Sequence, residues 1–143
     1  MDLASAGNPQ DVFVFCLAHA AATTNSPLGL SFSRPELQTA VFLLKQRLPG
    51  AARERGVLAD LLFDTNGAVP YSERLEDEIS SMVLSGTLTS RSATDPYYWL
   101  GGGRAKRMCT SRQFSSEDLA LIGPLIPLFI ECLSAVIAQR ATS

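Results

Sequence analysis

A cysteine and the only histidine of the chain lie close together near its start. Cys16 and His19 are three residues apart, so a helix would place them on one face. With Cys109 and Cys132 they would supply four zinc ligands, but structural zinc sites usually show two tight pairs of ligands. A Cys–His nucleophile would need the same histidine, and no neighbouring motif marks one. We therefore expect no metal, no cofactor and no catalytic residue, and rank a small Cys/His enzyme last among the alternatives.

A run of three glycines, residues 101–103, precedes a basic stretch and suggests a phosphate-binding loop. Such a loop needs its lysine followed by serine or threonine at a helix start. Here Lys106 is followed by Arg107, and the strand predicted before the glycines is aromatic. The run is therefore predicted to be a hairpin turn.

Basic residues gather around this turn with no acid between residues 104 and 112. Together they predict a basic wing, because wings contact phosphates without selecting a base sequence. The stretch is either a charged, solvent-exposed loop and hairpin or a wing that binds nucleic acid or an acidic partner. Its residues are Arg91, Arg104, Lys106, Arg107 and Arg112.

The segment from Tyr71 to Leu84 has the opposite charge. It holds four acids and one base, a net charge of −3. A helix that enters the major groove of DNA must approach phosphates, which would repel this one. We expect weak, salt-sensitive DNA binding at best. Two interpretations stay open: a solvated helix face, or an acidic face that binds a protein partner, with Tyr71, Glu73, Arg74 and Asp77 as its residues.

Composition is that of one globular domain. The chain has 143 residues, 46% of them hydrophobic, and a net charge of −2. That length fits a single domain with its own core. Three widely spaced cysteines do not form a disulfide framework, and the chain opens without a basic n-region. We therefore expect a cytoplasmic location. The apolar segment 119–138 carries Glu131 and two prolines, which disfavours a membrane span.

Periodicity and capping residues predict the elements. Helices are expected from about Asp11, from Ser33 to about Leu48, and from Ser72 to about Leu84. Short strands are expected at residues 61–63, 87–90 and 97–100. The last and longest helix should begin at Ser115 or Ser116, and Pro124 and Pro127 should kink or divide it.

These elements predict a mainly α fold with a small β-hairpin (α+β), a winged helix-turn-helix core plus a kinked C-terminal helix. We divide the single domain, residues 1–143, into a loose tail (1–9), the core (10–100) and the C-terminal helix (115–140). The predicted core residues share helical or strand periodicity: Leu37, Val41, Leu44, Leu75, Ile79, Met82 and Leu88.

The C-terminal helix has apolar residues nearly all round. A helix of that kind is buried in a large core or against another chain. We therefore predict a homodimer through this helix. The residues concerned are Leu119, Ile122, Ile126, Phe129, Ile130, Leu133, Val136 and Ile137.

Two stretches resemble one group of winged-helix proteins, the Panacea-type antitoxin domains and the YwgA-like proteins. Residues 32–48 carry the Leu37-Gln38 pair of their first motif, and residues 63–88 carry Pro70-Tyr71-Ser72 with Leu75 of the second. The chain departs from the pattern where Ala68-Val69 replace Tyr-Gly and Thr39 replaces lysine. The resemblance covers roughly residues 32–90. It implies a winged-helix core used in antitoxin-like or regulatory contacts with proteins, without catalytic residues.

The preferred hypothesis is thus a non-enzymatic winged-helix interaction module, antitoxin-like or an adaptor, that binds a protein. The alternative is a DNA-binding transcriptional regulator that uses the basic wing formed by Arg104, Lys106 and Arg107.

Overall fold

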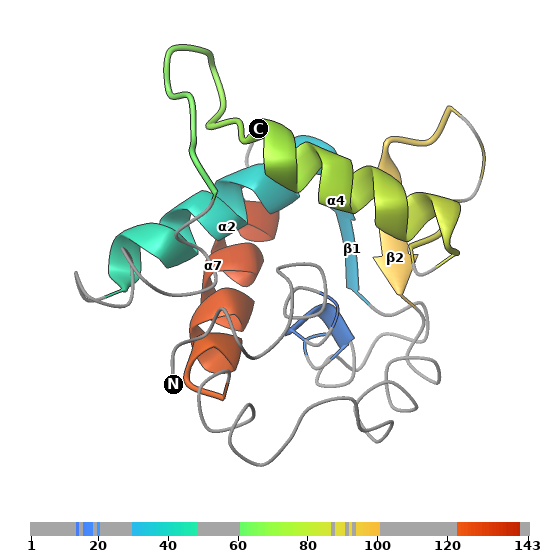
Figure 1. The fold of residues 1–143 in the computed structure, drawn as a ribbon. Coiled ribbons are helices and arrows are strands. Elements are labelled where there is room, and N and C mark those ends of the chain that lie inside the picture. The colour runs from blue at the N-terminus through green and yellow to red at the C-terminus, as the bar shows by residue number, and fades with distance from the viewer. Residues whose placement is uncertain are drawn as a thin grey trace.

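The computed structural model describes residues 14, 16–18, 20, 30–48, 61–86, 88–90, 92, 94–100 and 123–140. This part of the chain is mainly helical, as the sequence predicts, and it has a small two-stranded antiparallel sheet (Figure 1). Helical residues between 14 and 20 come first. They are followed by β1 (Leu30–Ser33), α2 (Arg34–Arg47), α4 (Glu73–Leu84), β2 (Tyr97–Leu100) and α7 (Leu125–Arg140).

Helix α2 begins at the predicted cap. The hydroxyl of Ser33 accepts the Glu36 N–H at 3.3 Å, and the Glu36 carboxylate accepts the Ser33 N–H at 2.8 Å. Pro35 lies in the first turn, where its missing N–H costs no helical hydrogen bond. This reciprocal capping box satisfies two amides that the helix leaves unpaired, an effect worth about 1 kcal/mol for a good cap.

Helix α4 also has its predicted ends. Ser72 is the N-cap and accepts the Leu75 N–H at 3.2 Å. At the other end Gly86 adopts φ +81°, and its N–H donates to the Val83 carbonyl at 3.1 Å. A left-handed glycine just past the helix is a common way to terminate it.

The sheet differs from the prediction. β1 pairs with β2 from Leu30↔Leu100 to Ser33↔Tyr97. The strand expected at residues 61–63 is wrong, because those residues have no strand partner. The strand expected at 87–90 is reduced to one antiparallel bridge, Thr89 with Trp99, with N···O distances of 2.9 and 3.2 Å. β2 therefore pairs with β1 and also with Thr89.

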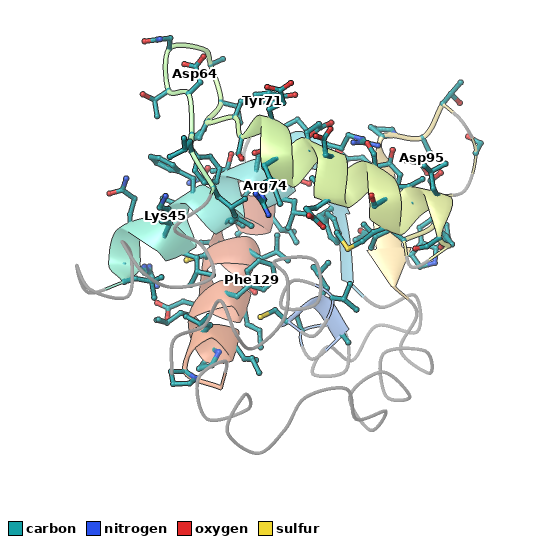
Figure 2. The ribbon with its side chains drawn as sticks, viewed as in Figure 1. Lys45, Asp64, Tyr71, Arg74, Asp95 and Phe129 are labelled. Carbon is teal, nitrogen blue, oxygen red and sulfur yellow. The ribbon has the colours of Figure 1, made fainter. Side chains whose placement is uncertain are left out.

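All seven predicted core residues are buried, so this prediction is confirmed. They lie in one hydrophobic cluster with side chains from the first helical segment, β1 and α7. Phe129 of α7 faces the centre of the molecule (Figure 2). The seven residues are Leu37, Val41, Leu44, Leu75, Ile79, Met82 and Leu88.

Helix α7 is shorter than predicted in its described part. Gly123 and Pro124 form a turn, and the helix begins at Leu125. Pro127 lies in its first turn, a position where proline needs no kink. The expected helix start at Ser115 or Ser116 lies outside the described residues. α7 packs along α2 (Figure 1), and Glu131 pairs with Arg47 at 3.1 Å. Among the described helices, none is long and apolar enough to cross a membrane.

Candidate interaction surface

The outward side of α4 is exposed along its length. Glu73, Arg74 and Asp77 are exposed, and so are Ser81 and Leu84. Successive positions advance by about 100° around a helix, which places these five on one side. We call them the α4 outer face. The predicted partner-binding residues Glu73, Arg74 and Asp77 therefore share one surface, and Tyr71 is 47% exposed just before the helix.

Leu84 is the residue that the sequence analysis missed. Its side chain is 88% exposed at the end of α4. The buried stripe of the helix is Leu75, Ile79 and Met82. Leu84 lies eleven positions after Glu73, about three turns, so helical spacing alone places it on the same side of the helix as the acids. The signal was present in the sequence.

The acids of α4 do not all face outward. The Glu76 carboxylate accepts a hydrogen bond from the Arg34 guanidinium at 2.7 Å, and both side chains are about three-quarters buried. Arg34 therefore compensates the charge of Glu76 inside the fold. The acidic character of the α4 outer face comes from Glu73 and Asp77, with Arg74 as the opposing charge.

Arg34 connects three elements. Besides Glu76 it donates to the Ser80 hydroxyl of α4 at 3.2 Å and to the Tyr98 hydroxyl of β2 at 3.3 Å. Its guanidinium carbon lies 5.5 Å from the centroid of the Tyr98 ring. Burial lowers the pKa of Arg34, but the bonds to Tyr98 and Glu76 outweigh burial and raise the pKa above its ordinary value. The side chain is therefore a permanent cation that fixes α4 against β2.

Gln38 fixes the start of α4 in a second way. Its side chain is 2% exposed. The amide oxygen accepts the Ser72 N–H at 2.9 Å, and the amide nitrogen donates to the Ser72 carbonyl at 3.0 Å and to Glu76 at 3.2 Å. A buried amide that pairs with both the N–H and the carbonyl of one residue holds a fixed geometry. Gln38 thus sets where the α4 outer face begins.

The segment before α4 forms a projecting loop. Asp64 and Tyr71 exchange backbone hydrogen bonds of 2.7 and 3.0 Å at its base. In Figure 1 the loop extends beyond α2 and α4, and Figure 2 places Asp64 and Tyr71 on this side of the molecule. Lys45 donates to the Leu61 carbonyl at 2.6 Å, and so ties the start of this segment to α2.

The two thiols among the described residues are poor nucleophiles. Cys16 and Cys132 are free and buried in the core. Burial raises the pKa of Cys16 to about 12. Burial also raises the pKa of Cys132, against the lowering effect of Arg47. A thiol that stays protonated at neutral pH does not attack substrates. His19 and Cys109 lie outside the described residues, among which no group of metal-binding side chains is found.

The predicted basic wing falls outside the described part of the chain. All five of its residues are outside the described ranges: Arg91, Arg104, Lys106, Arg107 and Arg112. The described residues of the hairpin, 88–90, 92 and 94–100, contain one charged residue, Asp95. Its carboxylate accepts the Tyr97 N–H at 2.9 Å, and Figure 2 shows it far from Lys45.

The predicted dimer face of α7 is largely covered by the chain itself. Ile126, Phe129, Leu133 and Val136 are buried in the core, and Ile130 and Ile137 are half-buried. Leu119 and Ile122 lie outside the described residues. The exposed positions of α7 are Pro127, Glu131, Ser134, Ala135, Ala138 and Gln139. In its described part α7 is therefore not apolar all round, and the homodimer stays a prediction without that support.

No protein-family model matches the chain, and no characterised protein and no solved structure shows significant similarity to it.

Proposed function

We propose that this chain is a non-enzymatic winged-helix interaction module, antitoxin-like or an adaptor, that binds a protein through the α4 outer face. The order of the elements supports the winged-helix assignment. Helical residues, β1, α2, α4, the Thr89 bridge and β2 follow one another, with β2 paired to both β1 and Thr89. On this assignment α4 would be the recognition helix, which DNA-binding helix-turn-helix proteins place in the major groove, and we infer that it faces a protein here.

The observation that carries the proposal is Leu84, which is almost fully exposed on the same side of α4 as Glu73 and Asp77. Full burial of a leucine side chain contributes about 1.5–3 kcal/mol, and here almost all of that surface is left to solvent. Tyr71, which lies just before the other end of α4, belongs to a residue type enriched among interface hot spots. Glu73 and Asp77 would oppose a phosphate backbone, so a protein fits this surface better than DNA.

The resemblance to the Panacea-type antitoxin domains gains one physical argument. Its two motifs are in direct contact, because Gln38 of the first motif binds the backbone N–H and carbonyl of Ser72 in the second. The matching residues therefore act as one unit that positions α4. The antitoxin-like role rests on this resemblance.

Affinity capture from cells that naturally express the chain tests the proposal. Four variants serve as baits beside the wild type. Asp77→Arg and Leu84→Ser change the α4 outer face. Gln46→Arg on α2 and Leu62→Ser before the projecting loop are matched controls at other exposed positions. We expect one partner to be retained by the controls and lost by the α4 variants.

The captured partner is then titrated against each purified variant. Loss of about 1.4 kcal/mol corresponds to a tenfold weaker Kd, which is the minimum we expect for either α4 variant. A partner that binds the α4 variants as well as it binds the controls would refute the surface.

The DNA-binding alternative is tested with the same proteins. We expect weak binding to duplex DNA that disappears with rising salt. Tight, sequence-selective binding at physiological salt would replace our proposal with the regulator hypothesis. In that case alanine at Arg104, Lys106 and Arg107 should lower the affinity uniformly across sequences. Light scattering of the wild type tests the predicted homodimer, which a clean monomer would exclude.

A further inference from the structure

The projecting loop contains an Asn-Gly pair at its exposed end. Residues 65–68 are all exposed, and the loop is closed only at its base, by the Asp64–Tyr71 bridge. The Asp64 carboxylate accepts the Asn66 backbone N–H at 2.9 Å, which sets the first turn. Asn66 and Gly67 are therefore exposed to solvent at the end of the loop.

The fold gives no conformational reason for glycine at position 67. Asn-Gly pairs are usually associated with turns of positive φ. Among the described glycines only Gly86 has positive φ. A Cβ built on Gly67 would lie 3.9 Å from the Val69 carbonyl oxygen, an ordinary contact. Alanine would therefore fit at this position.

Glycine at position 67 instead affects how readily the side chain of Asn66 reacts with the main chain. A residue without a Cβ leaves its backbone nitrogen open to approach. The Asn66 side chain and the Gly67 N–H make no hydrogen bond to the described residues, so neither reacting group is held away from the other. Asparagine is among the thermally labile residue types for this reason.

We propose that Asn66-Gly67 is a site of spontaneous deamidation in the folded protein. The Gly67 nitrogen loses its proton to hydroxide and attacks Cγ of Asn66. A new bond from the Gly67 nitrogen to Cγ closes a five-membered imide ring. The Cγ–Nδ2 bond of Asn66 breaks, and the departing nitrogen takes a proton from water and leaves as ammonia, which regenerates hydroxide. Water then opens the ring at either carbonyl and yields aspartate or isoaspartate. Hydroxide and water are the only co-reactants, and no group is oxidised or reduced.

The product changes the loop in two ways. It adds a carboxylate two residues from Asp64, at the end of a loop whose base includes Tyr71. In the isoaspartate product the main chain also gains one carbon, which displaces the backbone that Asp64 now caps. The modification would make this side of the molecule more acidic with age. It does not depend on the proposed function.

Peptide mass spectrometry of the folded protein, incubated in neutral and in mildly alkaline buffer, tests the proposal. The other two asparagines serve as internal references. Asn8 precedes proline, which has no N–H to attack, and Asn25 precedes serine, whose side chain hinders ring closure. We expect conversion at Asn66 to exceed that at Asn25, to rise with pH, and to give two products that separate by chromatography.

The matched variant is Gly67→Ala, which the available space accommodates. Circular dichroism and thermal unfolding first establish that it is folded like the wild type. We expect its conversion at Asn66 to fall to the level of Asn25 or below. Equal conversion in wild type and variant, or an intact Asn66 in the aged wild type, would overturn the proposal.

Discussion

The hydrogen bonds of Gln38 should contribute measurably to stability, and Gln38→Met isolates them. Methionine has a similar length and shape, so the substitution leaves little cavity behind. It removes the acceptor for the Ser72 N–H and the donors to the Ser72 carbonyl and Glu76. The Ser72 carbonyl keeps the helical bond from the Glu76 N–H at 3.0 Å, so the amide of Ser72 becomes the unpaired group.

The magnitude follows from these groups. Ser72 is buried, so its orphaned N–H costs about 1–3 kcal/mol. Loss of the bond to the Glu76 carboxylate adds about 1.5 kcal/mol to this cost, the lower value for a hydrogen bond to a charged group. We expect Gln38→Met to lower the free energy of unfolding by about 3 kcal/mol. For a domain of this length that corresponds to a fall in Tm of roughly 10 °C.

Urea unfolding followed by circular dichroism measures the effect. The control is Gln46→Met, which makes the same change at an exposed position of the same helix. We expect the control to stay within about 0.5 kcal/mol of the wild type. If Gln38→Met loses no more than Gln46→Met, the buried amide does not hold the start of α4, and our account of the α4 outer face fails with it.

Three further predictions concern the core, a helix end and a thiol. Alanine at Leu37, Ile79 or Phe129 should each cost about 2–5 kcal/mol in urea unfolding, whereas Leu84→Ala should cost less than about 0.5 kcal/mol; similar costs would contradict the burial pattern. Gly86→Ala should lose about 1–2 kcal/mol because φ is +81°, while Gly67→Ala should be close to neutral by the same measurement. Cys16 should resist thiol reagents in the native protein and react on unfolding. Because its folded pKa of about 12 exceeds the ordinary thiol value of 9.0, its contribution to stability is intact below pH 9 and falls by about 1.4 kcal/mol per pH unit up to about 12. Chemical unfolding of Cys16→Ala and wild type across that range checks the slope, and equal slopes would exclude it.

The parts of the fold that local signals specify were predictable. Helices α2 and α4 each have a serine cap, acids in the first turn and a buried stripe, and these signals agree. β1 was not predictable in the same way. Residues 30–33 adopt a strand because Tyr97–Leu100 supply the hydrogen-bond partners, and such a distant partner leaves no mark on a four-residue segment.

The residues of the candidate site also fall into those that local signals predict and those that depend on tertiary contacts. Tyr71, Glu73, Arg74 and Asp77 were found because charge and capping are local properties. Leu84 was available from helical spacing and was overlooked. The roles of Arg34 and Gln38 depend on partners in α4 and β2 that only the tertiary structure brings together. A sequence shows the residues of such a network without showing the contacts.

The pairing of α2 with α7 has a consequence for synthesis on the ribosome. The apolar side of α2 emerges early, but α7, against which it packs, is synthesised after all the other described elements. β1 likewise cannot form its hydrogen bonds until β2 has been synthesised. A nascent chain would therefore expose Leu44 and its neighbours until late in translation, which invites chaperone binding and slows folding relative to a bundle of local contacts.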